Sequence, residues 1–522
     1  MTEASAPAGL RPIVAIALPL FVAAALVYAL RDNVTSNELD TLLTARRFAD
    51  PDFMPGDWFL GLEQGPRRPF QVLLWPLVRW LPILAASVVG RLIGYAWLAA
   101  ALAKLAARLR IGPALALALG GVYVWAGQTL AGGEWLFGQV ESKVFAYGLI
   151  LFGLDAWLAR RPVRAAVLFG AATTLHVLVG GQATLGLALL ALVEWPSDRP
   201  AWRSRWLALL GWTLAAAPGL VILATAAMSR VESTPPVSWI YVVFRTPHHS
   251  NPLTWQLSWR ACLVGSVALG ALVVVPRLHR DRPELRTLAR FATATLGLFA
   301  AGLVAAWLPN GQKLLQVLPF RVGGALAMLV GVMLAGAGLS AALPRNAGRW
   351  LARFGALVCL VMAVLALRVD LDGLRAFPHG GRPPLPEVEG AALADAAGWI
   401  RHHSPVGAGI VVAPNHESVG YLANRPVVAM YKQTPPSQRD LVQWFRRLQA
   451  LAGGEVPPER GHPLLPALDS QFEGLDIAVY RDLGRRYNAS LLLLRRSDLR
   501  LPLLYRNALW SVYQLPAATA LP

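Results

Sequence analysis

The stretch "VRAAVLFGAATTLHVLVGGQATLGLALLALVE", Val163 to Glu194, decides how many times this chain crosses a membrane. A bilayer core of about 30 Å needs roughly 20 apolar residues in one helix, so the stretch is too long for one span and short for two. Its middle reads "HVLVGGQ", and paired glycines beside a histidine sit poorly inside one lipid-facing helix. The sequence therefore predicts two short helices that hinge at Gly180 and Gly181.

The composition of the whole chain is that of an integral membrane protein. Apolar residues make up 55% of the 522 residues and charged residues only 15%, and the mean hydropathy is +0.47. These values lie well away from those of a soluble domain. Further apolar runs occur at 10–30, 82–103, 112–130, 143–159, 207–228, 259–276, 290–308, 322–342 and 350–367. With two helices in 163–194, the sequence predicts an α-helical polytopic membrane protein with about eleven transmembrane helices.

Basic residues give an independent check on this count, because loops that stay in the cytoplasm collect Lys and Arg. If the N-terminus is cytoplasmic and 163–194 crosses twice, every cytoplasmic loop is basic. The residues concerned are Lys104, Arg108 and Arg110; Arg160, Arg161 and Arg164; Arg199, Arg203 and Arg205; Arg277, Arg280, Arg282, Arg286 and Arg290; and Arg345, Arg349 and Arg353. The formal charge of +18 is therefore largely an orientation signal. No continuous basic face supports nucleic-acid binding.

The hydropathy changes after the last apolar run. Residues 368–388 form a Pro- and Gly-rich linker, and helix and strand patterns alternate from 389 to 522. Helices are expected at "ALADAAGWIRHH", "SQRDLVQWFRRLQAL" and "LDIAVYRDLGRRY", and strands at "GIVVAP", "PVVAMY", "SLLLLRR" and "LWSVYQL". The sequence thus predicts a transmembrane domain at 1–367 and a soluble C-terminal α/β domain at 389–522. Eleven spans from an inside start place that domain on the outer side of the membrane.

Unusual polar residues concentrate on the predicted outer side. The first outer loop is long and acidic, with "NELD" and "DPDFMPGDWF" supplying Glu38, Asp40 and Asp57, and an amphipathic "PFQVLLWPLVRWL" follows. The second reads "GGEWLFGQVESK". The remaining outer candidates are Glu134, Glu141, Lys143, His176, His248, His249, Lys313 and Arg321. Three of the four lysines fall on the outer side, against the usual bias, which suggests that a negatively charged ligand is handled there.

Each of these features also has a structural interpretation. Glu134 or Glu141 beside Lys143 could form an interfacial ion pair, because a charged side chain at the end of a span can extend to the membrane surface at little cost in free energy. His176 could simply bond a backbone carbonyl, and the "HH" pair could be a solvated loop element, since two adjacent histidines without a carboxylate are a weak metal signal. Asp50 and Asp52 fit a turn with helix-capping residues.

Carboxylates, histidines and cations together suit group transfer from a lipid phosphate to a hydroxyl. A carboxylate base draws the proton from the acceptor, and Arg or Lys stabilises the departing phosphate. A proton-coupled transporter would instead carry ionisable residues near mid-membrane. Here Arg91 and Asp155 are the main charges inside spans, and Asp155 lies near the cytoplasmic end.

The motifs "NELD", "DPDFMPGDWF", "GGEWLFGQVESK", "LHVLVGG", "RTPHHSNPLTW" and "LQVLPFR", followed by an outer α/β domain, resemble the GT-C superfamily of polytopic membrane glycosyltransferases over the whole length. The resemblance implies a sugar donor linked to polyprenyl phosphate, an acidic residue in the first outer loop as base, and inverting transfer at the periplasmic face. Glu38 and Asp40 match the role of catalytic base best, and Asp57 is the next candidate. No "WWDYG"-type motif is present, so neither the sugar nor the acceptor (glycan, lipid or protein) is specified.

By this hypothesis Lys143, Lys313, Arg321 and the His248/His249 pair hold the donor phosphate, while Glu134 and Glu141 orient Lys143 or the sugar. His176 lies at the same surface. The carboxylates and histidines could also hold a divalent metal, although no ligand spacing demands one. The competing class is a non-enzymatic transporter of lipid or polysaccharide, or an assembly partner in envelope glycan export.

Overall fold

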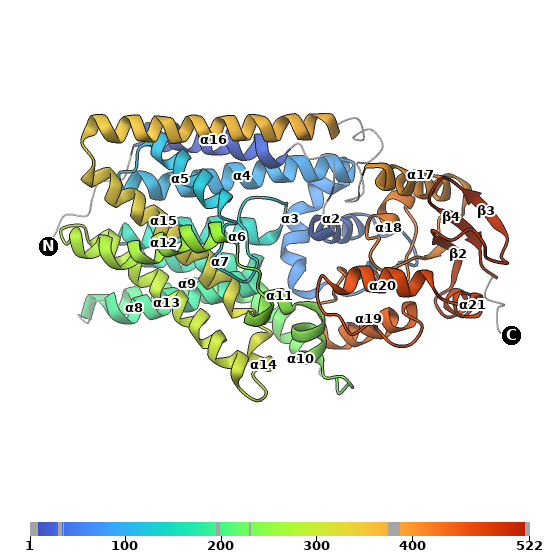
Figure 1. Ribbon diagram of the computed structural model, residues 1–522. Helices are drawn as coiled ribbons and strands as arrows, with labels where there is room; N and C mark the ends of the chain where they lie inside the picture. The colour runs from blue at the N-terminus through green and yellow to red at the C-terminus, as the bar shows by residue number, and fades with distance from the viewer. Residues whose placement is uncertain are drawn as a thin grey trace. The chain divides into compact units, whose positions relative to one another are not determined.

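The computed structural model of the chain describes residues 9–29, 34, 36–194, 199–228, 231–373 and 387–516. It divides into two compact units, each assembled from separated parts of the chain (Figure 1). Unit 1 comprises Met1–Leu30, Val89–Ala224 and Thr246–Val369, and unit 2 comprises Arg31–Val88, Thr225–Arg245 and Asp370–Pro522. Unit 2 thus includes two segments that the sequence analysis assigned to the transmembrane domain. Most of the expected linker, 374–386, lies outside the described residues.

The long helices coincide with the predicted apolar runs. They are α1 (Leu10–Ala24, continued by η1, Ala25–Ala29), α4 (Ile83–Arg108), α5 (Pro113–Trp125), α6 (Ser142–Leu158), α7 (Pro162–Leu175), α8 (Val177–Glu194), α9 (Arg199–Met228), α12 (Trp259–Leu278), α13 (Pro283–Trp307), α15 (Pro319–Ala342) and α16 (Arg345–Gly373). Within the described residues, eight of these helices are long and apolar enough to cross a membrane; α5 and α7 are apolar but shorter, and α6 has 17 residues. The chain is therefore a multi-pass membrane protein, as predicted. Short helical turns α11 (Pro247–Ser250), η4 (Pro252–Thr254) and α14 (Gln312–Leu315) connect the spans.

Helix α15 forms the centre of unit 1. Of its most apolar window 83% is buried, against 17% for α1 and α9 and 12% for α16. It packs against α12 and α13, which gives it apolar contacts on several sides. A helix that is apolar all round suits either the interior or the lipid, and the burial figures separate these two cases. The exposed apolar side chains of α1, α9 and α16 therefore form surface suited to lipid.

The break inside 163–194 is real, but the predicted position of the hinge was wrong. Helix α7 ends at Leu175 and α8 begins at Val177, with His176 in an extended conformation between them. Gly180 lies inside α8, where a Cβ atom would meet the backbone N of Thr173 at 2.1 Å. The glycine is therefore required for close packing of α8 against α7, and it does not form the turn.

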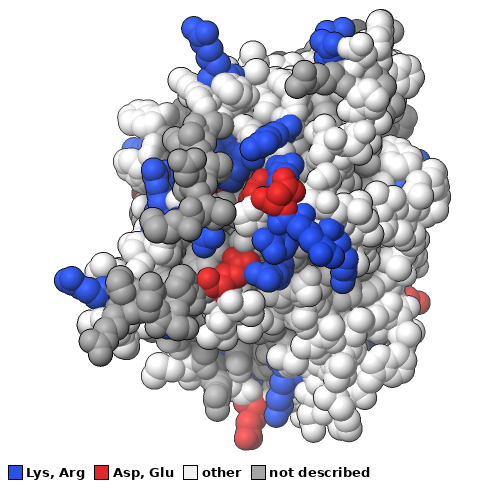
Figure 2. All heavy atoms as spheres, turned by 90° about the vertical axis from the view of Figure 1, so that its left-hand side faces the viewer, with Lys and Arg blue, Asp and Glu red and all other residues white. Residues whose placement is uncertain are grey.

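Acidic residues near the predicted cytoplasmic ends are paired with basic ones. Asp155 lies 3.2 Å from Lys104 Nζ and 2.6 Å from Arg108 Nε. Glu194 accepts from Arg290 Nη1 at 2.9 Å. Figure 2 shows one face of the molecule on which Lys and Arg side chains gather around a few carboxylates. Asp155 is thus a neutralised charge, and the structure gives it no feature of a proton relay.

Unit 2 contains a small mixed sheet covered by helices (Figure 1). The strands are β1 (Gly409–Val411), β2 (Ala489–Leu494), β3 (Leu503–Arg506) and β4 (Ser511–Gln514), in the order β1-β2-β4-β3, with β1 parallel to β2 and the other pairs antiparallel. The helices are α2 (Ser36–Ala49), η2 (Gly65–Arg67), α3 (Arg68–Trp80), α10 (Val237–Trp239), η3 (Ile240–Arg245), α17 (Glu387–His403), α18 (Ser418–Ala423), α19 (Gln438–Leu451), α20 (Leu464–Glu473) and α21 (Ile477–Arg486).

Most elements of the C-terminal part were predicted from its sequence, with one clear error. "PVVAMY" is not a strand: Val427 forms only an isolated bridge with Ile410, although Val427 to Tyr431 are all buried. Burial of this apolar run, rather than a hydrogen-bonded ladder, fixes its course. The sequence analysis missed α18, α20 and β3.

The hydrophobic core of unit 2 draws on more than the C-terminal segment. Ile240 and Phe244 of η3 are fully buried among Trp444, Phe445 and Leu448 of α19. The Phe244 and Phe445 rings lie edge to face with centroids 4.9 Å apart. Residues of a loop between two spans therefore complete the core of the α/β region.

The predicted amphipathic segment of the first outer loop is helix α3. Phe70, Leu74 and Val78 are buried on one side of it. Trp75 and Trp80 remain 42% and 79% exposed on the other. A helix with exposed tryptophans is suited to the interface between lipid and water.

Candidate functional site

Three charged side chains form the centre of a buried group in unit 1. Glu134 lies in the loop between α5 and α6, Lys143 lies in the first turn of α6, and Arg321 lies near the start of α15. Lys143 Nζ is 2.8 Å from Glu134 Oε1, and Arg321 Nε is 2.6 Å from Glu134 Oε2. One carboxylate therefore holds two cations that are far apart in the sequence.

The loop that carries Glu134 is held by its own backbone and by Gln128. The Gln128 amide accepts hydrogen bonds from the backbone N–H groups of Leu136 and Phe137 and donates to the carbonyl of Phe137. Gly132 and Gly133 have φ values of +77° and +65°, a conformation that glycine adopts without strain. The glycines of "GGEW" thus turn the chain so that Glu134 enters the interior.

Glu134 is ionised in this environment. Burial raises its pKa, but the charges of Arg321 and Lys143 outweigh burial and hold the pKa at about 2. The backbone N–H of Trp135 also donates to Glu134 Oε1 at 3.1 Å. A carboxylate with such a low pKa orients cations and is a poor general base near neutral pH.

Lys143 is enclosed by protein. Only 1% of its side chain is exposed, its Nζ lies 3.6 Å from the centroid of the Trp135 ring, and Glu141 Oε2 is 3.4 Å away. A snorkelling lysine would extend toward water or lipid headgroups, so that interpretation does not hold for Lys143. Arg321 is the more open cation of the group, with 18% of its side chain exposed.

The histidines lie around this group as hydrogen-bonding residues. His249 Nδ1 donates to the Gly132 carbonyl at 2.6 Å, which leaves Nε2 as an acceptor. Burial and the charge of Arg321 lower the pKa of His249 well below its usual range, so the ring is neutral. The His248 ring lies 4.1 Å from that of His249. His176 Nδ1 accepts from the Val179 N–H at 3.3 Å, and its ring lies within the electrostatic reach of Arg321 and Glu134.

Lys313 is placed differently from the other predicted donor residues. It lies in the short helix α14 and is exposed, and the described part of the chain offers it no ion-pair partner. The structure brings together Glu134, Glu141, Lys143 and Arg321, with the histidines nearby. It does not include Lys313 in this ion-paired group.

The three predicted catalytic carboxylates belong to unit 2. Glu38 and Asp40 lie on α2 and are 0% and 8% exposed, and Ser87 Oγ donates to Glu38 Oε1 at 3.1 Å. Asp57 accepts from the backbone N–H of Leu60 at 2.9 Å and from that of Val427 at 3.4 Å. Burial raises the pKa of Asp57 above its usual value. Both oxygens of Asp57 are thus engaged in joining two segments of unit 2.

Two tyrosines near the charged group were missed. Tyr123 of α5 and Tyr147 of α6 are fully buried and lie close enough to Glu134 to feel its charge. Neither hydroxyl has a hydrogen-bond partner among the described residues. Buried hydroxyls normally have partners, so these two suggest a site for a ligand. Their sequence context, single tyrosines in apolar helices, carries no signal of this role.

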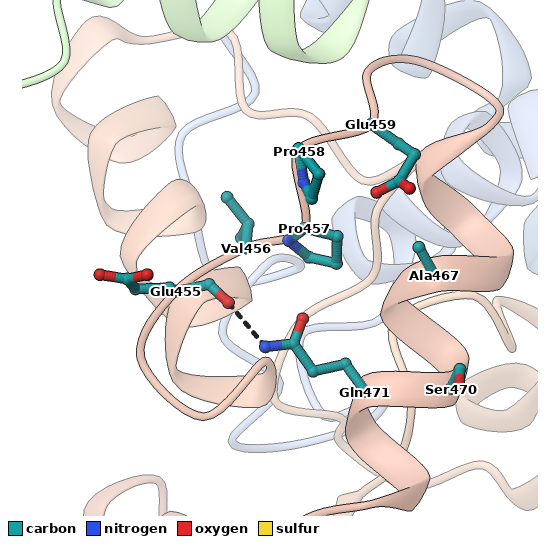
Figure 3. Close-up of a pocket in the computed structure, with 8 residues that line it drawn as sticks. All are labelled: Glu455, Val456, Pro457, Pro458, Glu459, Ala467, Ser470 and Gln471. Atoms are coloured by element: carbon teal, nitrogen blue, oxygen red, sulfur yellow. Dashed lines mark hydrogen bonds between the residues drawn. The ribbon is translucent and has the colours of Figure 1, made fainter.

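Within the described residues, no cluster of three or more His, Cys, Asp and Glu side chains could hold a metal ion. A pocket of about 500 Å³ lies in unit 2 between the loop at 455–459 and α20 (Figure 3). Its lining contains Pro457, Pro458 and two glutamates, and the Gln471 amide donates across it to the Glu455 carbonyl. This open hollow contains none of the candidate site residues.

Comparisons with known proteins agree with the fold. A family model described as "Domain of unknown function (DUF6798)" matches residues 391–451, and no curated protein matches the chain. The structure of ArnT from Cupriavidus metallidurans in the apo state is similar at a TM-score of 0.50, with 14% sequence identity and 98% of each chain covered. This likeness spans both chains almost completely. The chain therefore has a fold similar to that of ArnT.

Two further structures give lower scores. The Archaeoglobus fulgidus oligosaccharyltransferase tethered with an acceptor peptide has a TM-score of 0.49 at 12% identity, covering 92% of this chain and 69% of that one. ArnT from Cupriavidus metallidurans bound to undecaprenyl phosphate has a TM-score of 0.44 at 15% identity, covering 99% and 100%.

Proposed function

We propose that this chain, with its GT-C fold, is a membrane glycosyltransferase that moves a sugar from a polyprenyl-phosphate-linked donor to a hydroxyl acceptor. The reaction would take place at the periplasmic face of a bacterial inner membrane, with the N-terminus in the cytoplasm. The observation that carries the proposal is the ion-paired group of Glu134, Lys143 and Arg321. The lipid bilayer holds the donor, and the acceptor is a glycan, lipid or protein.

The proposed mechanism is a single inverting displacement. Glu38 or Asp40 takes the proton of the acceptor hydroxyl, and the acceptor oxygen attacks the anomeric carbon of the sugar. The bond between that carbon and the phosphate oxygen breaks, and polyprenyl phosphate leaves with the additional negative charge. Cations that are already in position stabilise this charge as it develops, which is where catalysis gains most.

Arg321 is the residue proposed to contact the donor phosphate directly. Glu134 holds its Nε atom, and the guanidinium is the most open cation of the group. Lys143 and Glu141 then act by fixing Glu134 and balancing the charge of the group. The hydroxyls of Tyr123 and Tyr147 and the acceptor nitrogen of His249 are suited to the sugar, which offers donors and acceptors.

Copurifying lipid tests the donor class. The full chain should be isolated in mild detergent, and mass spectrometry of the extract is expected to find a polyprenyl phosphate or its glycosylated form. Arg321→Ala should lose most of this lipid. Arg260→Ala is the matched control, because Arg260 lies exposed at the start of α12, against Trp125 and Trp259. Equal lipid in the parent, in Arg321→Ala and in Arg260→Ala would remove Arg321 from donor binding.

A further inference from the structure

Two arginines of unit 2 meet at one residue, Thr434. Arg245 ends the turn η3, and its Nε donates to Thr434 Oγ1 at 2.9 Å. Arg67 ends the turn η2, and its Nη2 donates to the Thr434 carbonyl at 3.1 Å. Three segments that are distant in sequence thus bring two guanidinium groups together.

Neither guanidinium has a carboxylate partner within the described residues. Arg245 is only 8% exposed, and its guanidinium carbon lies 4.7 Å from the centroid of the Tyr431 ring. Arg67 Nη1 is buried without a hydrogen-bond acceptor among the described residues. A buried charge normally has an ion or several hydrogen bonds as compensation. The two arginines therefore lack a counter-ion among the described residues, and one buried guanidinium nitrogen lacks an acceptor there.

The residue beneath Arg245 is rigidly held. The Tyr431 hydroxyl lies 3.1 to 3.3 Å from the carbonyl oxygens of Phe244, Arg245 and Gly461, which share its one donor proton. Phe244 is fully buried in the core of unit 2. Arg245 is consequently fixed before any ligand arrives, which reduces the entropy lost on binding.

The surroundings of the two arginines are positive. Desolvation of its ring and the charges of Lys432 and Arg245 lower the pKa of His462 to about 4. The charge of Arg460 also reaches Tyr431, as does that of one carboxylate, Glu417. His462 is exposed at its surface, so this positive region is open to solvent on that side.

We infer that Arg245 and Arg67 form a second anion site, which binds the phosphate group of a ligand. A tetrahedral phosphate presents oxygens to both guanidinium planes at once, whereas a planar carboxylate matches the fork of one arginine. Lys432 adds a point charge beside Tyr431. The phosphate belongs either to a lipid headgroup or to a phosphorylated small molecule. This site is independent of the donor site proposed above, which lies in unit 1.

Binding by the purified full chain tests the inference. The protein should be reconstituted in phosphatidylcholine nanodiscs with and without phosphatidic acid, and inorganic phosphate should be titrated separately into the phosphatidylcholine sample. Thermal unfolding reports binding as a rise in Tm that grows with the logarithm of ligand concentration above Kd. Arg245→Gln and Arg67→Gln are each expected to weaken binding roughly ten- to a hundredfold, as for a lost charged hydrogen bond. Arg446→Gln removes the same charge from the exposed side of α19 and should bind like the parent.

The outcomes separate the sources of the phosphate group. A response to phosphatidic acid alone identifies a lipid headgroup, and a response to inorganic phosphate shows that the phosphate group suffices. No response to either, an equal response to chloride at the same ionic strength, or parental binding by both glutamine variants would overturn the inference. If Arg245→Gln has a lower Tm than the parent in the absence of ligand, its weaker binding could reflect lost folding. Binding by Arg67→Gln and Arg245→Lys then tests the inference. The lysine keeps the charge but loses the fork, so its binding should be intermediate.

Discussion

Lys143 Nζ lies 2.8 Å from Glu134 Oε1, with 1% of the lysine and 0% of the glutamate side chain exposed. A pair so enclosed is strongly coupled to stability, because removing either partner leaves the other as a buried charge with one counter-ion fewer. Site-directed changes at this pair must therefore distinguish loss of folding from loss of chemistry.

A paired substitution makes that distinction. Lys143→Met alone should lower the free energy of unfolding by about 3 to 5 kcal/mol, because it leaves Glu134 with one cation fewer. Adding Glu134→Gln removes the second charge and should recover much of the stability. Transfer should not recover, because Glu134→Gln also removes the carboxylate that holds Arg321 Nε. Thermal unfolding and a transfer assay on the same samples provide both measurements, and parental transfer by the double variant would assign the pair a purely structural role.

The acidic residues of α2 are expected to include the catalytic base. Loss of a general base lowers transfer by roughly a hundred- to ten-thousandfold. Glu38→Gln or Asp40→Asn should show this loss, and Glu38→Gln keeps an acceptor for Ser87 Oγ. Glu63→Gln, at an exposed position of the same loop, is the control. Rates are compared at saturating donor, and parental rates in both α2 variants would exclude this helix from proton transfer.

Asp57 should make stability depend on pH with a definite sign. Because burial raises the folded pKa of Asp57, its contribution to stability is complete below the unfolded pKa, about 3.9, and is lost as pH rises through the folded value. Asp57→Asn removes this dependence. The Tm of the variant relative to the parent should therefore rise with pH from acid to neutral. A constant difference across the range would mean that the carboxyl does not titrate anomalously.

The contact between α7 and α8 predicts opposite outcomes at two neighbouring glycines. A Cβ atom at Gly180 would meet backbone atoms of Thr173 and Ala172 at 2.1 to 2.4 Å. Relieving this overlap requires a shift of the helix backbone, which costs stability. Gly180→Ala should destabilise by about 1 to 3 kcal/mol or more. A Cβ atom at Gly181 meets nothing within 4 Å, so Gly181→Ala should be neutral or slightly stabilising. Equal Tm values for the two variants would show that the helices can separate there.

Local patterns predicted local structure well. The apolar runs became helices because a chain in lipid must satisfy its own backbone hydrogen bonds. "GGEWLFGQVESK" was recognised because glycines and charges interrupt apolar sequence. Its link to Arg321 could not be read from the sequence, since nearly 180 residues separate them. The hinge was misplaced for a related reason. Gly180 is a glycine because helix α7 packs closely against it, and a single sequence does not distinguish a glycine needed for a turn from one needed for close packing.

Non-local packing also explains the other differences. The segment from Val427 to Tyr431 is buried but not paired as a strand. Its sequence resembles that of a strand, because buried segments and buried strands both favour β-branched and apolar residues. The hydroxyls of Tyr123 and Tyr147, which have no hydrogen-bond partner among the described residues, depend on which side chains surround them. The meeting of two arginines at Thr434 depends on three separate segments.

The three-part composition of unit 2 has a consequence for biosynthesis. Its first segment, 31–88, is made early, and Asp57 finds the Val427 N–H only after several hundred more residues have left the ribosome. Phe244 likewise can pack against Phe445 of α19 only after that helix has been synthesised. During translation the early segments of unit 2 therefore lack these packing partners until the end of the chain has been made. A chain stopped at the last span would therefore lack the partners of its own first loop, so loss of activity on such truncation would report failed assembly of unit 2 as much as loss of an accessory domain.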